Sequence, residues 1–188
     1  MVVATTNPCR MDTEKKALRQ SIRQQRRTLM PTEADAIAAS RTLVEKLEAH
    51  PRFREAESVA LYWSLPDEPH THELLERVFR QKRVYLPIVR GDDMHLCRFC
   101  GRSEMRLGDF NILEPNGEQL EDVRSLPLIV VPGVAFDDDL YRLGRGRGYY
   151  DRFLPLLPHA YKLGLCFDFQ KVEHVPTDAN DIRMDEVL

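Results

Sequence analysis

A short run of glycines that alternate with arginines is the segment of this sequence best suited to chemistry. The run reads Gly144, Arg145, Gly146, Arg147, Gly148. Glycine lets backbone N–H groups approach an anion closely, and arginine adds forked hydrogen bonds that match phosphate oxygens. Asp151 follows, and its carboxylate is the hard oxygen ligand that a Mg²⁺ ion accompanying phosphates needs. The pattern indicates a phosphate site, with a solvated basic turn or an RNA-contacting Arg-Gly tract as the alternatives.

The segments on either side of this run support the phosphate interpretation. An apolar segment, 126–136, precedes it, and a segment with a helical pattern, 149–157, follows it. A strand, a Gly-rich turn and a helix N-terminus in that order can hold phosphate. The spacing is neither that of a Walker A motif nor G-x-G-x-x-G, because the third glycine comes one residue early. The sequence therefore excludes the two commonest nucleotide-binding motifs.

Composition predicts one soluble domain. The chain has 188 residues, of which 43% are hydrophobic and 30% charged, with a net charge of −3. We expect a single domain over 12–188 after a disordered tail over 1–11. The net charge argues against nucleic-acid binding, and no apolar run is long enough for a membrane span or a signal peptide. We therefore expect a cytoplasmic monomer that acts on small molecules and keeps its four cysteines as thiols.

Hydrophobic periodicity predicts strands and helices that alternate along the chain. Helices are expected over 13–29, 32–49, 71–81 and 149–157, and strands over 58–63, 83–89, 94–99, 128–131 and 161–167. Residues 101–124 are polar and rich in turns. The pattern predicts an α/β three-layer sandwich, in which a mainly parallel sheet is covered by helices on both faces, with an N-terminal helical arm. Glu68 and the Gly-Arg run both follow strands, so both are expected at the ligand-binding edge of the sheet.

Four further patterns have a structural and a functional interpretation. They are the basic stripe Lys15, Arg19, Arg23, Arg27; the segment Glu68–Glu73, with two histidines; the acidic run Asp137–Asp139; and the pair Cys97 and Cys100. From the residues alone, the stripe is a solvated helix face. A loop with Thr71 as helix N-cap explains the histidine segment better than a metal site does. A solvated turn explains the acidic run better than Mg²⁺ binding does, and a structural role explains the cysteines, because no second C-x-x-C follows.

Several separated motifs resemble the 5-formyltetrahydrofolate cyclo-ligase family, also called methenyltetrahydrofolate synthetases. The longest are Val131–Phe136 and Arg142–Leu154, and the others, in the expected order, are Lys15–Arg19, Leu61–Glu68 with Thr71, Gly108–Pro115 and Asn180–Val187. Together they extend from Lys15 to the end of the chain. Such an ordered set is much more specific than the glycine-arginine run alone.

The resemblance implies an activity and a set of roles. The activity is ATP- and Mg²⁺-dependent cyclisation of 5-formyltetrahydrofolate to 5,10-methenyltetrahydrofolate, through phosphorylation of the formyl oxygen, with release of ADP and phosphate. The implied catalytic residues are Arg145, Arg147 and Tyr149. The implied ATP contacts are Lys15, Arg19, Arg142, Gly144, Arg145, Gly146, Arg147, Gly148, Tyr149 and Tyr150. The implied folate contacts are Trp63, Glu68, Arg145, Gly146, Arg147, Gly148 and Tyr149. Asp151 and Asp181 are the implied Mg²⁺ ligands.

The chemistry of three side chains bears on these implied roles. The Glu68 carboxylate can accept two N–H bonds from an aminopyrimidine edge such as that of a pterin. Trp63 offers an apolar face to a flat ligand, or is a core aromatic at the end of a strand. Tyr149 lies beside the ligand or packs the helix onto the sheet. An RNA-binding module and an enzyme acting on phosphate or CoA esters remain the alternative functions.

Overall fold

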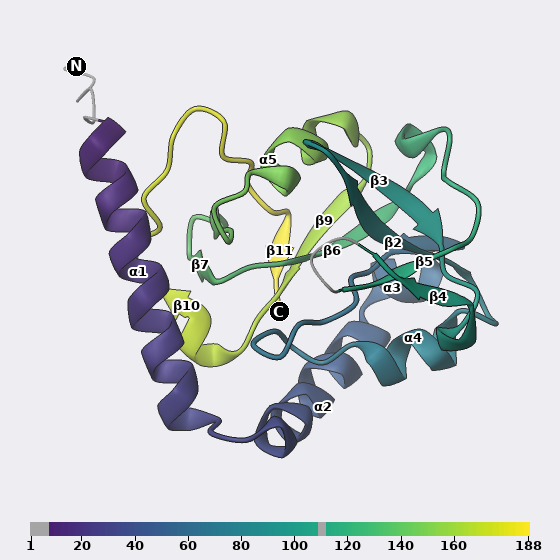
Figure 1. The fold of residues 1–188 in the computed structure, drawn as a ribbon, viewed down its shortest axis with the longest axis horizontal. Helices are drawn as coiled ribbons and strands as arrows, with labels where there is room; N and C mark the ends of the chain where they lie inside the picture. The colour runs from purple at the N-terminus through teal and green to yellow at the C-terminus, as the bar shows by residue number, and fades with distance from the viewer. Residues whose placement is uncertain (1–7, 109–111) are drawn as a thin grey trace.

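A six-stranded sheet forms the centre of the molecule. The computed structural model describes residues 8–108 and 112–188. In sheet order the strands are β11 (Glu186–Val187), β9 (Tyr161–Leu165), β6 (Leu128–Pro132), β1 (Ser58–Ala60), β2 (Arg83–Arg90) and β3 (Asp93–Arg98) (Figure 1). All neighbours in this sheet are parallel except β2 and β3, which form an antiparallel hairpin. The mainly parallel sheet predicted from the sequence is therefore confirmed.

Helices cover both faces of this sheet, as the hydrophobic pattern predicts. On one face lie α2 (Glu33–Ala49), α3 (Pro51–Glu55) and α4 (His72–Val78), and on the other lies α5 (Tyr149–Phe153) (Figure 1). The first three helices contribute Leu47, Phe53 and Leu75 to one buried cluster, and Phe153 of α5 belongs to a second. The buried strand β6 contributes side chains to both clusters, which explains its nearly continuous apolar sequence.

The order of the strands predicts where ligands bind. From β1 the chain moves outward to β2 and β3, whereas from β6 it moves in the opposite direction to β9 and β11. The two central strands, β1 and β6, are parallel neighbours. A crevice opens beyond the carboxyl ends of two such strands, because the connections that leave them diverge. The segments 61–71 and 133–148 follow these two ends and border that crevice.

The N-terminal arm is a long helix, α1 (Pro8–Leu29), that runs along one side of the molecule (Figure 1). Its Ile22 is buried in a third cluster with Ala135, Leu143 and Val175. Two of these residues belong to a small sheet in the order β10 (Lys171–Val172), β7 (Ala135–Asp137), β8 (Arg142–Leu143). The arm is thereby held against the segment that carries the glycine-arginine run.

Several predicted boundaries need correction. Helix α1 begins at Pro8 rather than Thr13, because proline is well tolerated in the first helical turn, so residues 8–11 are helical. The expected disordered tail over 1–11 is therefore wrong for residues 8–11, and residues 1–7 lie outside the described residues. Helix α4 ends at Val78, three residues before the expected end. Helix α5 ends at Phe153 and continues as a 3₁₀ turn, because Pro155 lacks the N–H that a longer helix would require.

The remaining elements are short. The turn-rich segment contains an antiparallel hairpin of β4 (Met105–Leu107) and β5 (Leu113–Pro115). The 3₁₀ turns are Arg102–Glu104, Val123–Ser125, Leu154–Leu156 and Asp168–Gln170. Within 8–108 and 112–188, no helix has the length and apolarity needed to cross a membrane. Cys97, Cys100 and Cys166 are all thiols, in agreement with the sequence-based expectation.

Candidate active site

Two cavities of different character meet at the glycine-arginine run. The first, the apolar cavity, has a volume of about 310 Å³ and is lined by Tyr62, Trp63, Leu86, Val89, Met94 and Tyr149 among others, with Glu68 and Arg145 at its polar end. The second, the polar cavity, has a volume of about 590 Å³ and is lined by Lys15, Arg19, Asp151, Asp178 and Asp181 among others. Arg142 and Gly144 line both cavities. A group at Gly144 is therefore accessible from either side.

The loop after β1 presents Glu68 to the apolar cavity. Thr71 closes this loop: its hydroxyl donates to the Tyr62 carbonyl at 2.6 Å, and its N–H donates to the Ser64 hydroxyl at 3.1 Å. Thr71 is the N-cap of α4, as predicted, although its side chain makes no capping hydrogen bond. The Tyr62 hydroxyl donates to the Pro69 carbonyl at 3.1 Å. These bonds fix the loop conformation before any ligand arrives.

The carboxylate of Glu68 is buried and already hydrogen-bonded. Its side chain is 8% exposed. Oε2 accepts the Leu65 N–H at 2.9 Å, and Oε1 accepts Nε and Nη2 of Arg145 at 3.2 and 3.0 Å. Burial raises the pKa of Glu68, and the charge of Arg145 opposes that rise. The structure thus brings Glu68 and the glycine-arginine run together at the predicted edge of the sheet.

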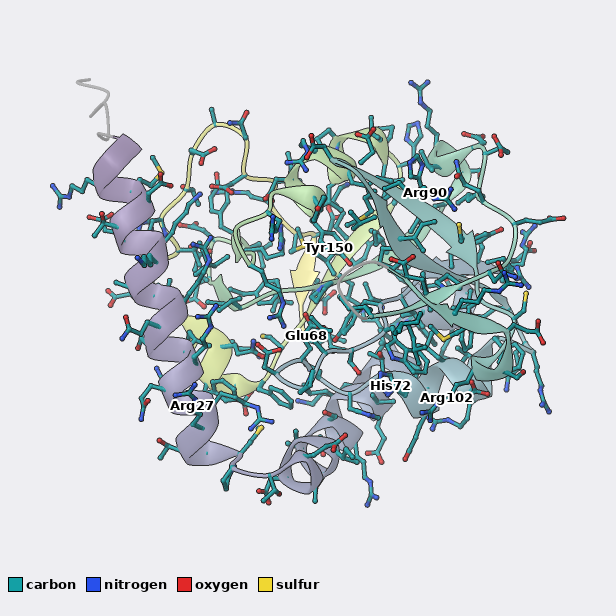
Figure 2. The ribbon with its side chains drawn as sticks, in the orientation of Figure 1. Arg27, Glu68, His72, Arg90, Arg102 and Tyr150 are labelled. Atoms are coloured by element: carbon teal, nitrogen blue, oxygen red, sulfur yellow. The ribbon has the colours of Figure 1, made fainter. Side chains whose placement is uncertain are left out.

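Trp63 is partly committed to packing. His72 stacks on its ring with 3.8 Å between centroids, and the Arg102 guanidinium lies 6.0 Å from the ring centroid. Figure 2 shows His72 and Arg102 on the same side of the molecule. Burial lowers the pKa of His72 to about 4, so its ring is neutral near pH 7 and Nε2 donates to the Ser64 carbonyl at 3.1 Å. The remaining surface of Trp63 lines the apolar cavity.

Both tyrosines at the start of α5 line the apolar cavity rather than the polar one. Burial raises the pKa of the Tyr150 phenol, and the nearby charge of Glu68 adds to the rise. The Arg142 guanidinium lies 5.3 Å from the Tyr150 ring centroid. The Tyr149 hydroxyl donates to the Gly91 carbonyl at 3.4 Å. Each tyrosine therefore packs locally and also borders the space available to a ligand.

The conformation of the run requires glycine at two positions. Gly146 has a φ of +97° and Gly148 a φ of +69°, in the region that side-chain-bearing residues rarely adopt. Gly148 directly precedes α5, which spans only five residues. A helix of this length has a small dipole, so an anion here would depend on loop N–H groups and arginines. This modifies the expectation that a helix N-terminus contributes strongly.

The polar cavity is bordered by ion pairs between remote segments. Lys15 Nζ donates to Asp181 Oδ2 at 2.7 Å and to Asp178 Oδ2 at 3.1 Å. Burial lowers the pKa of Lys15, but hydrogen bonds and charges from the two carboxylates outweigh this effect and raise it. Arg19 Nε donates to the Gly144 carbonyl at 2.8 Å. The first half of the basic stripe is therefore engaged in the site and is not a solvated face.

Arg142 is the least accessible of the predicted ATP contacts. Its side chain is 4% exposed, and Nη2 donates to Asp151 Oδ1 at 2.6 Å. Its Nη1 donates to the Pro132 carbonyl at 3.4 Å, and its buried Nε has no hydrogen-bond partner. Asp151, the predicted Mg²⁺ ligand, thus has one carboxylate oxygen in an ion pair. Arg147, by contrast, is exposed and lines the apolar cavity.

The described residues contain no group of three or more His, Cys, Asp or Glu side chains arranged to hold a metal ion. Asp151 and Asp181 nevertheless line the same cavity. The acidic run is not a solvated turn throughout, which corrects the prediction. Asp137 is buried, and its carboxylate accepts the N–H groups of Tyr141 and Val175 at 2.9 Å each. Its role is to hold two chain segments together.

Comparison with known proteins decides the family. The model of the 5-formyltetrahydrofolate cyclo-ligase family matches residues 11–188. The chain belongs to this family. It is 31% identical to the mouse 5-formyltetrahydrofolate cyclo-ligase, over 95% of this chain and 94% of that protein. It is 32% identical to the Escherichia coli K12 enzyme of the same name, over 89% of this chain and 95% of that protein.

Solved structures agree with this family membership. The NMR structure of the Aquifex aeolicus 5,10-methenyltetrahydrofolate synthetase superimposes with a TM-score of 0.81 and 35% identity, covering 92% of this chain and 88% of that one. The Mycoplasma pneumoniae synthetase has the same fold, with a TM-score of 0.73 at 24% identity. The family assignment extends over both cavities, because their lining residues run from Asp12 to Ile182.

Two carboxylates beside the predicted residues escaped the sequence analysis. Lys15 forms ion pairs with both Asp178 and Asp181. Arg145 forms ion pairs with both Asp67 and Glu68. Asp67 directly precedes Glu68, so the sequence could have indicated its role through two successive acidic residues after a strand. Asp67 and Arg145 also line a third cavity of about 360 Å³, the arginine groove, with Arg23, Arg26 and Arg27. The second half of the basic stripe faces this groove rather than the polar cavity.

Proposed function

We propose that this chain catalyses the ATP- and Mg²⁺-dependent cyclisation of 5-formyltetrahydrofolate to 5,10-methenyltetrahydrofolate, with release of ADP and phosphate. The observation that carries the proposal is the meeting of two chemically different cavities at Gly144. A flat, largely apolar substrate suits the first cavity, and a polyphosphate suits the second. A phosphate held near Gly144 would then face a substrate oxygen in the apolar cavity, as phosphoryl transfer requires.

On the folate side, Glu68 supplies the acceptor for the pterin. Its carboxylate has the wrong sign for a triphosphate and the right acceptors for an aminopyrimidine edge. The apolar walls formed by Leu86, Val89 and Met94 suit the ring system, and Trp63 and Tyr149 border the same space. We assign these residues to substrate binding.

On the nucleotide side, Lys15 and Arg19 supply positive charge from α1. They lie one helical turn apart and both line the polar cavity. Gly144, Gly146 and Gly148 permit close approach of a phosphate to the backbone. Arg145 and Arg147 neutralise charge on the phosphoryl group during transfer, and Tyr149 lies beside them.

The proposed Mg²⁺ ligands fit the ion in their chemistry. Both are carboxylates, the oxygen ligands that Mg²⁺ prefers, and both line the cavity proposed for the phosphates. Oδ2 of Asp151 and Oδ1 of Asp181 have no hydrogen bond among the described residues, so each retains an oxygen for a metal. A Mg²⁺ ion there supplies charge neutralisation to the phosphate oxygens.

The proposed reaction needs alignment more than a protein nucleophile. The formyl oxygen is a poor leaving group. When it attacks the γ-phosphorus of ATP, the bond to the β–γ bridging oxygen breaks and ADP leaves. Nitrogen 10 then attacks the activated formyl carbon and releases its proton to solvent, the phosphorylated oxygen departs as phosphate, and the ring closes. Arg145 and Arg147 stabilise the charge that develops on the transferring group.

The same proposal describes the setting of the reaction. The enzyme acts in the cytoplasm as a monomer, on small molecules and without nucleic acid or membrane. One chain supplies the side chains that line both cavities, which supports a monomer. The net charge of −3 supports the absence of nucleic acid from the reaction.

An absorbance assay tests the function directly. Purified protein with 5-formyltetrahydrofolate, ATP and Mg²⁺ should form the methenyl product, and omission of ATP or chelation of the metal should abolish product formation. A folded protein that forms no product under the complete conditions contradicts the proposal. A protein that instead binds RNA, with an affinity that collapses as salt is added, supports the alternative binding-module function.

A further inference from the structure

The Glu68 carboxylate has too few free acceptor positions to receive a pterin as it stands. A carboxylate has about four lone-pair sites, two on each oxygen. Oε1 already accepts two N–H groups from Arg145, and Oε2 accepts the Leu65 N–H. An aminopyrimidine edge that donates one N–H to each oxygen therefore needs Arg145 to give up at least one bond to Oε1. Folate binding at Glu68 must displace a proposed catalytic guanidinium.

After this displacement, Asp67 is the carboxylate that still pairs with Arg145. Arg145 Nη2 donates to Asp67 Oδ1 at 2.5 Å, in addition to its bonds with Glu68. Burial alone would lower the pKa of Arg145, but the hydrogen bonds and charges of Asp67 and Glu68 together raise it. Asp67 is 41% exposed and lines the arginine groove, not the apolar cavity. A ligand in the apolar cavity therefore leaves this second ion pair intact.

Asp67 is the only acidic side chain among the described residues that line the arginine groove, so without it no carboxylate there would hold a displaced guanidinium. The other charged groups that line the groove are Arg23, Arg26 and Arg27, which repel it. No ion pair within the described part of the chain joins any of these three arginines to a carboxylate. Without a fixed partner the long Arg145 side chain samples several rotamers. Ordering it again in the transition state then costs conformational entropy.

We propose that Asp67 is a positioning residue that holds Arg145 at the border of the apolar cavity after the folate has taken its place on Glu68. The proposal rests on the proposed function and adds to it a residue that acts only through Arg145. The displaced guanidinium keeps one anchored nitrogen, and its remaining N–H groups become available to the phosphate oxygens. Asp67 therefore affects turnover and not recognition of the pterin.

Kinetics of Asp67→Asn and Asp67→Glu test the proposal. Asp67→Asn keeps the shape and removes the charge, and it should lower kcat about 10-fold, the loss expected for one charge-assisted hydrogen bond in the transition state. Asp67→Glu keeps the charge and should retain kcat within about threefold of the unmodified enzyme. Glu121→Gln is the control, because Glu121 is exposed and removal of its charge should leave kcat unchanged. The thermal transition of each variant is recorded alongside.

Binding of the folate is measured separately from turnover. Trp63 is the only tryptophan of the chain and lines the apolar cavity, so its fluorescence reports 5-formyltetrahydrofolate binding without ATP. The dissociation constant of Asp67→Asn should stay within about threefold of the unmodified value, because Glu68 is intact. A double-mutant cycle then asks whether Asp67 acts through Arg145. In the Arg145→Ala background, Asp67→Asn should change the residual kcat less than about twofold.

The outcomes separate the possibilities. A kcat for Asp67→Asn equal to that of Glu121→Gln overturns the proposal. So does a 10-fold loss that persists in the Arg145→Ala background, since Asp67 would then act independently. A weakened folate affinity with unchanged kcat makes Asp67 a folate contact and also overturns it. Unmodified enzyme that forms no methenyl product overturns the proposed function itself, and this result is distinct from any loss confined to the variants.

Discussion

The two cavities that meet at Gly144 differ in how the chain builds them. The polar end of the apolar cavity comes from one short loop, whose conformation is set by hydrogen bonds among Tyr62, Ser64, Pro69 and Thr71. The polar cavity instead joins α1 to the C-terminal segment through ion pairs such as Lys15 with Asp181, which are 166 residues apart. The first cavity is preformed, whereas the second is held by charges that a nucleotide would also contact.

This difference has a consequence for ligand binding. The proposed phosphate contacts Lys15 and Arg145 and the proposed Mg²⁺ ligands Asp151 and Asp181 are all paired with an opposite charge in this structure. Pairing stabilises buried charges that would otherwise be costly. ATP and Mg²⁺ must therefore exchange partners with several existing ion pairs, whereas the pterin displaces only the Glu68–Arg145 bonds in a cavity whose apolar walls are already in place.

Arg145→Ala should have the largest effect, because Arg145 belongs to the phosphate loop, lines the apolar cavity and is paired with Glu68 at the same time. We expect kcat/KM to fall about 10³-fold, the scale of losing a donor that stabilises transition-state charge. Gly146→Val should cause a similar loss, since its φ of +97° strains any side-chain-bearing residue. Steady-state kinetics with ATP varied measure both. Near-normal values in both variants would contradict the phosphate-loop assignment.

Asp151→Asn and Asp181→Asn should raise the Mg²⁺ concentration needed for half-maximal activity about 10- to 100-fold, as loss of a carboxylate ligand weakens metal binding. Asp178→Asn is the matched control, because Asp178 also pairs with Lys15 but is not a proposed metal ligand. Titration of activity with Mg²⁺ distinguishes the three variants. A metal requirement raised equally in all three would mean that the carboxylates act only on Lys15.

Glu68→Gln should affect the folate and not the nucleotide. We expect the folate KM to rise, or kcat to fall, about 10-fold, because one charged acceptor of a buried hydrogen-bond pair is replaced by a neutral amide. The KM for ATP should stay within about twofold of its original value. Glu73→Gln on the neighbouring helix α4, where Glu73 is exposed, is the control. A change confined to the ATP KM would reverse the assignment of the two cavities.

Lys15→Ala and Arg19→Ala should each raise the ATP KM about 10-fold, since each removes one cation from the proposed phosphate site. Both should leave the folate KM nearly unchanged. Arg23→Ala is the matched control from the same stripe, because Arg23 lines the arginine groove and not the polar cavity. Kinetics that show no ATP effect for the first two variants, or an equal effect for the third, would contradict the proposed nucleotide side.

The smallest expected effect is on the pH dependence of stability, through His72 beside the apolar cavity. The pKa of His72 is lowered to about 4 from 6.5. Between these values the unfolded chain binds a proton that the folded protein does not, so the free energy of unfolding falls as pH falls through this window. In His72→Phe this decrease should be smaller. Its Tm should therefore fall a few degrees less than that of the unmodified protein between pH 6.5 and 4. His159→Phe, at an exposed position, should not. An unchanged pH dependence in His72→Phe would contradict this assignment.

Much of the architecture was predictable because hydrophobic periodicity is a local property. The continuous apolar run of β6 and the spacing of Leu74, Leu75 and Val78 in α4 indicate the right elements. The ends of the helices were less predictable. Thr71 is the N-cap of α4, as predicted, but its hydroxyl donates to the Tyr62 carbonyl and makes no capping hydrogen bond. The position of that carbonyl is set by the folded loop, and local sequence does not reveal it.

The sequence by itself determined the fold class, the family motifs and the identity of the side chains that gather around the glycine-arginine run. These depend on residue type and spacing, which the sequence contains in full. Only the tertiary structure decided which partner each charge has: Arg142 lies buried on Asp151, whereas Arg145 turns the other way onto Asp67 and Glu68. The two arginines are alike in sequence. Arg142 lies in β8, whereas Arg145 lies in the loop after it, so each meets the carboxylate that the long-range fold has placed beside its own segment.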